Sequence, residues 1–356
     1  MIARRGDRCG TFGPMTTDTA EATTTGPRPG KLTATDGATI EYFTCGDPSS
    51  PALMLSPAFT GSAHLYVEKF GAALPDYHVV GVQLRAHGYG GGCTFGDLTY
   101  CTQAQSPEAG TYRGLRLSRL AADLRETRLH LRLSKVAMMG HSMGMNVVAE
   151  YISDFGTQDL TGLFVYDQSP KNLADGVDPE NATFPQDVAT YPMDQFNQLI
   201  ASFQDYDPSA GYAKVPSSVR QMLGGPSGDP VFNPKTQDPA FVLTEQAWRK
   251  WASFADTMNG KALSLLFWSS MTSDYTDVYR VVRESPLPVL VYGGESSIVP
   301  LKAMKWVHEQ LPGSEFLVFG KWTGVHGAFL NPPPSGDDFM TAVRSFLDRR
   351  VRPRSP

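Results

Sequence analysis

Short runs of apolar residues recur along the chain, each bounded by residues that favour turns. Six of these runs have the length of a strand: 52–55, 78–82, 135–139, 162–166, 288–292 and 315–319. Their content of β-branched and aromatic residues indicates strands buried on both faces. Two earlier segments flank Asp36-Gly37, a dipeptide typical of a tight hairpin. The sheet is therefore expected to begin with an antiparallel pair.

Between the runs lie segments whose apolar residues have the spacing of an amphipathic helix. They include residues 115–133, the stretch after Ser142, and residues 337–349. Such alternation of strands and helices is typical of an α/β fold with a mostly parallel sheet and helices on both faces. The alternation stops between residues 171 and 285, where a proline-rich stretch precedes a Trp-rich helical pattern.

The pattern divides the chain into three parts. Residues 1–30 are predicted to be a disordered N-terminal tail. Residues 31–170 and 286–356 are predicted to form the α/β core, and residues 171–285 an inserted helical cap. The 356 residues are therefore expected to form one core interrupted by an insertion, although their number alone suggests two domains.

Composition and charge exclude several classes of protein. Apolar residues make up 41% of the chain and charged residues 19%, as in ordinary globular proteins. The formal net charge of −5 offers no basic surface for nucleic acid or an anionic membrane, so neither is expected as a partner. No apolar run approaches the roughly 18 residues of a membrane-spanning helix, and the N-terminus lacks the apolar segment of a secretory signal. We therefore expect a cytoplasmic protein, and the oligomeric state is not indicated.

The four cysteines are too few for a disulfide scaffold, and none forms the Cys-x-x-Cys pair typical of zinc sites. Cys93 and Cys101 bracket a glycine-rich loop, where they either form a disulfide or stay reduced. Nothing in the sequence suggests a metal or an organic cofactor.

The sequence Gly-His-Ser-Met-Gly at residues 140–144 lies between a predicted strand and a predicted helix. In this context it is typical of the sharp turn that presents a nucleophilic serine. Ser142 is therefore predicted to be the nucleophile, and the N–H of Met143 to face the negative charge that develops during reaction. The alternative is that Ser142 only caps the helix.

A serine nucleophile needs a base, and the base needs an orienting carboxylate. In the chain order that goes with this turn the histidine comes late, which leaves His308 and His326. His308 lies at helical spacing on an expected solvated face. His326 lies in a loop rich in glycine and proline that follows the predicted strand 315–319. We therefore predict that His326 is the base.

At these residues the chain resembles the α/β-hydrolase superfamily, the fold of esterases, lipases and lactonases. The resemblance covers residues 31–170 and about 286–350. It rests on the serine turn, on Arg-Ala-His-Gly at residues 85–88, on Asp123 and on His326. It implies the α/β-hydrolase fold, a cap over the active site, and a reaction that needs no cofactor.

The chain departs from the family pattern at the acid. The family usually carries an aspartate in a Gly-x-x-Asp turn after the strand 288–292, where this chain has a serine. Some members carry the acid after the preceding strand, and Asp167 lies directly after the run 162–166. Asp167 is therefore the predicted acid, and Glu295 is the alternative.

A second departure concerns the oxyanion hole. The family usually has His-Gly after its third strand, whereas residues 55–61 here read Leu-Ser-Pro-Ala-Phe-Thr-Gly. The backbone must still present an N–H to the oxyanion. We assign this donor to Phe59, with Ala58 or Thr60 as alternatives, and the second donor to Met143.

Aromatic residues are frequent in the second half of the predicted cap. Trp251 and Trp268 are predicted to line an apolar substrate pocket, although packing of the cap on the core is the alternative.

Together these residues predict a serine hydrolase that cleaves an ester, lactone or thioester of a medium-sized apolar small molecule through an acyl-enzyme on Ser142. Alternatively, the same residues serve acyl transfer, C–C cleavage, a lyase reaction or a cofactor-free cyclisation in secondary metabolism, because a fold does not fix a reaction. A non-catalytic ligand-binding protein is a further alternative.

Overall fold

A computed structural model describes residues 26–85, 87, 115–173, 198, 201, 260–321, 323–331 and 333–352. Most of the predicted tail and of the predicted cap lies outside these residues, as do Cys93, Cys101 and Trp251. Their predicted roles therefore stay predictions.

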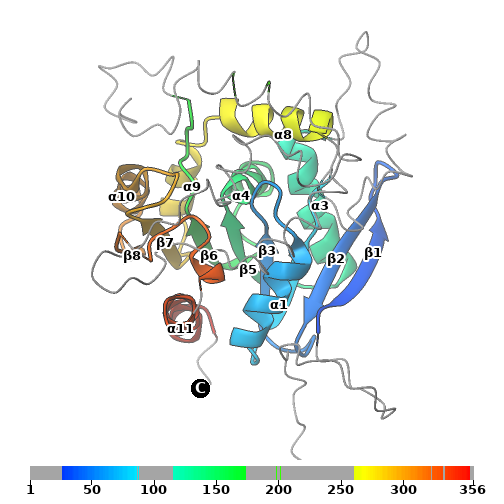
Figure 1. The fold of residues 1–356 in the computed structure, drawn as a ribbon. Coiled ribbons are helices and arrows are strands. Elements are labelled where there is room, and N and C mark those ends of the chain that lie inside the picture. Colours follow the sequence, from blue (N-terminus) through cyan, green and yellow to red (C-terminus); the bar gives the residue numbers. More distant parts are fainter. Residues whose placement is uncertain are drawn as a thin grey trace, which may run out of the picture.

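An eight-stranded sheet runs through the described part of the chain (Figure 1). Its order is β1-β2-β4-β3-β5-β6-β7-β8. The strands are β1 (Arg28–Thr33), β2 (Thr39–Cys45), β3 (Ala52–Ser56), β4 (His78–Val82), β5 (Val136–His141), β6 (Leu160–Tyr166), β7 (Val289–Gly294) and β8 (Glu315–Phe319). The pairs β1–β2 and β2–β4 are antiparallel and the other pairs are parallel. This confirms the predicted fold class and the antiparallel start, while β1 begins three residues inside the segment assigned to the tail.

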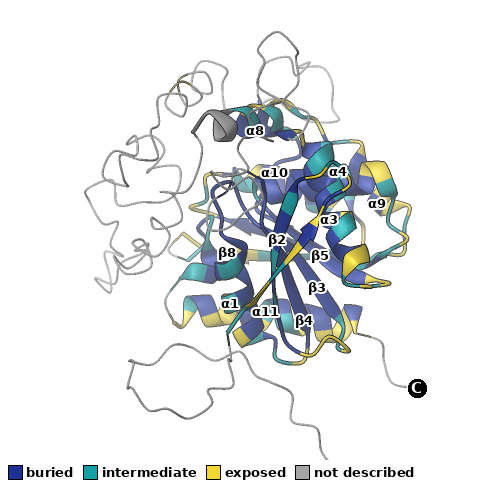
Figure 2. Cartoon of the chain, turned by 90° about the vertical axis from the view of Figure 1, so that its right-hand side faces the viewer, coloured by how far each residue is buried: buried dark blue, intermediate teal, exposed yellow. Residues whose placement is uncertain are grey.

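Helices cover both faces of the sheet (Figure 2). One face carries α3 (Leu117–His130), α4 (Met143–Phe155), α8 (Gly260–Thr272), α9 (Val278–Arg283) and α10 (Leu301–Gln310). The other face carries α1 (Ala63–Ala73), the short η5 (Ala328–Leu330), α11 (Ser335–Phe346) and η6 (Leu347–Val351). The strand β3 shows why its run is apolar throughout, because Met54 faces the first layer while Leu53 and Leu55 face the second.

The two ends of the inserted segment lie side by side. Lys171 and Asp274 form an isolated antiparallel bridge and an ion pair with an Nζ–Oδ2 distance of 3.2 Å. The N–H of Tyr275 donates to the carbonyl of Pro170 at 2.9 Å. After this contact the chain continues through α9 into β7, which is hydrogen-bonded to β6.

Cys45, at the end of β2, is buried and disulfide-bonded. Disulfides persist mainly in oxidising compartments, and the cytoplasmic location stays a prediction. In the described ranges, no helix has both the length and the apolar character needed to cross a membrane.

Candidate active site

Ser142 lies in a sharp turn between β5 and α4. Its φ of 53° and ψ of −130° are sterically unfavourable for a residue with a side chain. The turn is held by two backbone hydrogen bonds, from the N–H of Ser142 to Tyr166 at 2.9 Å and from the N–H of Met145 to Ser142 at 2.7 Å. The serine side chain is partly exposed. Strain of this kind is found where the surrounding structure imposes it, often at functional residues.

The two glycines of the turn permit close approach of the elements around Ser142. A Cβ atom on Gly144 would overlap the carbonyl oxygens of Ser56 and Pro57, and one on Gly140 would overlap the backbone of Met145. The N-terminus of α4 therefore packs directly against the loop after β3. This places the N–H of Met143, in the first turn of the helix, beside that loop.

The structure brings Asp167 and His326 together from positions 159 residues apart. Asp167 directly follows β6, is fully buried, and has a φ of 52°. Its Oδ2 accepts a hydrogen bond from Nδ1 of His326 at 2.8 Å. Because the carboxylate accepts at Nδ1, Nε2 of His326 is the nitrogen available to a serine hydroxyl. The His326 side chain is 19% exposed in the loop after β8.

Asp167 also accepts a hydrogen bond from the hydroxyl of Ser297, in the turn after β7. Burial raises the pKa of Asp167, while the hydrogen bonds from His326 and Ser297 oppose that rise. Ser297 occupies the position where the family usually has its aspartate, and we assigned it no role from the sequence. Glu295, the alternative acid, is exposed. The geometry therefore favours Asp167 as the acid.

The loop after β3 is anchored by Tyr66 of α1. The N–H of Ala58 donates to the Tyr66 hydroxyl at 3.1 Å, so this N–H is already engaged. The hydroxyl is also hydrogen-bonded to Nδ1 of the buried His141. Thr60 follows with a φ of 62°. Of the three donors considered in this loop, Ala58 is the least suited to bind an oxyanion, and Phe59 remains our assignment.

His141 connects the elements that carry the candidate residues. Its ring stacks on Tyr166 with centroids 4.0 Å apart, and lies 4.6 Å from the ring of His326. Burial lowers the pKa of His141 well below its usual value, and the nearby His326 lowers it further. His141 therefore stays neutral. Through its ring contacts it connects the turn at Ser142 with β6 and with the loop that carries His326.

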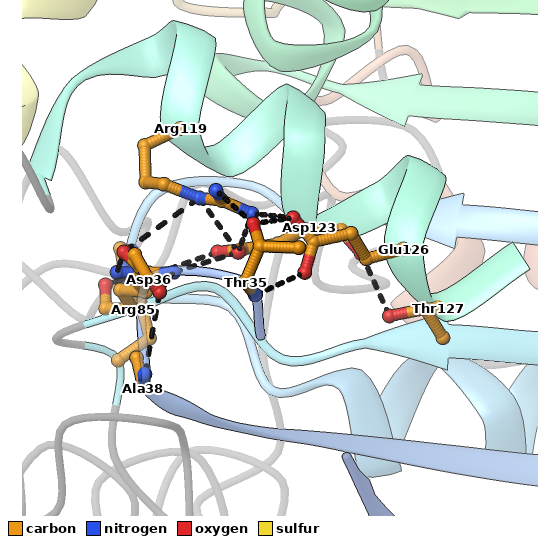
Figure 3. Close-up of polar contacts among 9 residues, drawn as sticks. Thr35, Asp36, Ala38, Arg85, Arg119, Asp123, Glu126 and Thr127 are labelled. Carbon is orange, nitrogen blue, oxygen red and sulfur yellow. Dashed lines mark hydrogen bonds and ion pairs between the residues drawn. The ribbon is translucent and has the colours of Figure 1, made fainter. Parts of the chain in front are cut away.

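A buried ionic network supports the loop after β4 (Figure 3). Arg85 is fully buried and pairs with Asp123 of α3 and with Asp36 of the β1–β2 turn, at 2.7 Å each. The Arg85 carbonyl accepts from Nδ1 of His87 at 2.9 Å. The ring of His87 packs edge-on against Phe59 with centroids 5.6 Å apart. The network thereby supports His87, which packs against Phe59 of the loop after β3.

The helix α8 of the inserted segment packs over the same loop. Phe267 is buried, and its ring centroid is 5.0 Å from that of Phe59. Two hydrogen bonds from Asn146 of α4 to Ser270, at 2.8 and 3.0 Å, hold the helix. Trp268 is 55% exposed, which does not fit the predicted wall of a buried pocket. Phe267, one residue earlier, is the aromatic residue of this helix that packs against the loop after β3.

The comparisons with known proteins agree with this architecture. Residues 51–323 match the family described as the α/β hydrolase fold. No curated protein has significant sequence similarity to the chain.

Three solved structures illustrate the structural similarity. An esterase from Exiguobacterium antarcticum has a TM-score of 0.66 at 17% identity, covering 89% of this chain and 98% of the esterase. A bromoperoxidase from Bacillus anthracis has a TM-score of 0.65 at 18% identity, covering 90% of this chain and 100% of that chain. An enol-lactonase from Burkholderia xenovorans has a TM-score of 0.61 at 12% identity, with coverage of 90% and 100%.

Identities this low support the fold alone, whereas the family match spans most of the sequence. The chain belongs to the α/β-hydrolase fold family.

Proposed function

We propose that the chain is a serine hydrolase that cleaves an ester, lactone or thioester of a medium-sized apolar small molecule. The observation that carries this proposal is the Asp167–His326 pair, whose imidazole lies 4.6 Å from the ring of His141, the residue that precedes Ser142 in its strained turn. A carboxylate, an imidazole and a serine in this order are the components of nucleophilic acyl transfer.

In the proposed mechanism, Oγ of Ser142 attacks the substrate carbonyl carbon and its proton moves to Nε2 of His326. Asp167 holds the imidazole through Nδ1 and stabilises its positive charge. The N–H groups of Phe59 and Met143 stabilise the oxyanion. His326 then donates the proton to the leaving alcohol, enol or thiol. A water molecule, deprotonated by His326, releases the acid from the acyl-enzyme and regenerates Ser142.

The expected substrate is apolar because the groups next to the oxyanion loop are aromatic. The rings of Phe59 and Phe267 pack together with their centroids 5.0 Å apart, and both residues are buried. The names of two structural neighbours, an esterase and an enol-lactonase, fit an ester or a lactone as the substrate. The bromoperoxidase neighbour is a reminder that one fold serves different reactions, so products must be identified.

The test is covalent labelling with a fluorophosphonate probe, followed by peptide mapping. We expect an adduct on Ser142 and none in Ser142→Ala. Turnover of p-nitrophenyl esters should fall by about 10⁴-fold in Asp167→Asn, the range known for such a substitution, and stay near wild type in Glu295→Gln. A folded protein that neither labels nor turns over ester would refute the proposal and favour a binding protein.

Product analysis separates hydrolysis from the other reactions of the same residues. With an added alcohol or amine acceptor, a hydrolase still releases mainly free acid. Predominant transfer to the acceptor would instead identify an acyltransferase.

A further inference from the structure

The carboxylate of Asp167 has an uneven set of partners. Its Oδ2 accepts two hydrogen bonds, from Nδ1 of His326 and from Oγ of Ser297, whereas Oδ1 is buried and has no partner among the described residues. A fully buried carboxylate is costly to ionise without donors. Ser297 therefore supplies one of the two hydrogen bonds on which the charge of Asp167 depends.

The hydroxyl of Ser297 is oriented by its own surroundings. The N–H of Val299 donates to Oγ of Ser297 at 3.1 Å, so the hydroxyl acts there as an acceptor. Its single hydrogen remains for Asp167. The sheet brings Ser297 close to Asp167, because β6 and β7 are parallel neighbours in which Tyr166 lies opposite Tyr292. The turns that follow these two strands therefore meet.

We propose that Ser297 is a positioning residue of the active site, which fixes the rotamer of the Asp167 carboxylate so that Oδ2 faces His326. The role rests on the proposed function, since it acts through the acid and the base. It differs from a mere packing role because the hydroxyl hydrogen, rather than the volume of the side chain, is what matters.

Loss of this hydrogen bond has a defined electrostatic consequence. Burial raises the pKa of Asp167, and without Ser297 only His326 opposes that rise. The other titratable groups that face the carboxylate are Tyr166 and Tyr292, whose own pKa values are raised by burial, so both stay neutral. His141, next to His326, is also neutral because burial lowers its pKa. In Ser297→Ala the acid limb of the activity profile should therefore move to higher pH.

The first test compares Ser297→Ala with Ser296→Ala. Ser296 is the adjacent, exposed serine, and its hydroxyl donates to the backbone of Lys321, away from Asp167. For a p-nitrophenyl ester we expect kcat of Ser297→Ala to fall roughly 10- to 100-fold with little change in KM, the range for one hydrogen bond to a charged group. Ser296→Ala should match wild type in kcat and in pH profile.

A second pair of variants separates the hydroxyl from the packing. Ser297→Thr and Ser297→Val have the same shape, but only threonine keeps a donor. We expect kcat of the threonine variant to stay within a few-fold of wild type and that of the valine variant to fall as in Ser297→Ala. Equal kcat values and equal acid limbs for the two would overturn the proposal, even if Ser297→Ala proved unstable.

Failure of this inference can be told apart from failure of the proposed function. If wild-type protein labels at Ser142 but Ser297→Ala retains the wild-type kcat and pH profile, only the role of Ser297 is refuted. If wild-type protein neither labels nor turns over ester, the proposed function fails and the positioning role fails with it.

Discussion

Ser142 and Asp167 share an unusual backbone conformation at the ends of adjacent strands. Their φ angles are 53° and 52°, in a region that residues with side chains rarely adopt. Such a conformation costs about 1–3 kcal/mol per residue and persists only where neighbouring contacts hold it. Around Ser142 those contacts include His141, which stacks on Tyr166 and is hydrogen-bonded to Tyr66.

We expect Tyr66→Phe to lower both stability and kcat. The substitution leaves the N–H of Ala58 and Nδ1 of His141 buried without their partner, which should cost about 1–3 kcal/mol in the free energy of unfolding. It also releases the loop after β3, which we propose to hold the oxyanion, so kcat should fall about tenfold or more. Urea unfolding and steady-state kinetics measure the two effects.

Tyr77→Phe is the matched control for this prediction. Tyr77 is equally buried, and its hydroxyl donates to Asp348 at 2.8 Å, within the last helical segment of the described chain. Loss of the Tyr77 hydroxyl should reduce the free energy of unfolding without changing kcat. Similar kcat values for the two phenylalanine variants would contradict the role of Tyr66.

At this scale the sequence indicated Ser142, His326 and Asp167, because each lies in a recognisable motif or directly after an apolar run. It gave no role to Ser297 or Tyr66. The Ser297 hydroxyl reaches a carboxylate 130 residues away, and the Tyr66 hydroxyl reaches a histidine 75 residues away. Hydroxyl residues are common, so only the folded structure distinguishes these two from the others.

At the scale of elements, the ionic network joins the β1–β2 turn, the loop after β4 and α3 (Figure 3). Asp36 accepts from Arg85 and from the N–H of Ala38. Partial burial raises the pKa of Asp36. Its partner Arg85 and the other donors lower this pKa by a larger amount, so the net shift is downward. A lowered pKa means that the folded state favours the ionised form.

We therefore expect Asp36→Asn to reduce the free energy of unfolding by about 1–3 kcal/mol at pH 7. The stabilisation by Asp36 is complete above the ordinary aspartate pKa of about 4 and is lost as pH falls through the lowered value. The difference between variant and wild type should thus shrink in strong acid. Asp76→Asn, which removes an exposed pair with Arg344, should have little effect at any pH.

The elements themselves were largely predictable. Each of the six apolar runs overlaps a strand of the sheet. For five of them, burial on both faces leaves a continuous apolar signal. The sixth, at the edge strand β8, is only partly buried, so the expected burial on both faces was wrong there. The spatial order of the strands was not predictable, since β4 lies between β2 and β3 although it follows β3 in the chain. That order depends on how the crossover helices pack, which no local pattern records.

At the scale of the whole molecule, buried neutral histidines determine the response to acid. Burial lowers the pKa of His87 to about 4, and it lowers the pKa values of His141 and His78 below their usual value. In the unfolded chain these side chains titrate near 6.5. Below that pH the unfolded state binds more protons than the folded state, so stability must decrease.

We expect the free energy of unfolding to fall progressively as pH is lowered from about 6.5 to about 4. In His87→Asn this dependence should be weaker, because the amide can still donate to the Arg85 carbonyl but does not titrate. His130→Asn, at an exposed position on α3, is the control for the substitution itself. Denaturant unfolding at several pH values measures the slopes, and equal slopes for wild type and His87→Asn would contradict the assignment.

The contact between Pro170–Lys171 and Asp274–Tyr275 also has a consequence for evolution of the family fold. The two ends of the intervening segment are therefore already fixed together. For a flexible segment closed in this way, the entropic cost of closure grows only with the logarithm of its length, so doubling the length costs about 0.6 kcal/mol. Insertions and deletions in this segment therefore perturb the sheet little. Ligand preference can diversify there while the residues of the serine turn stay unchanged.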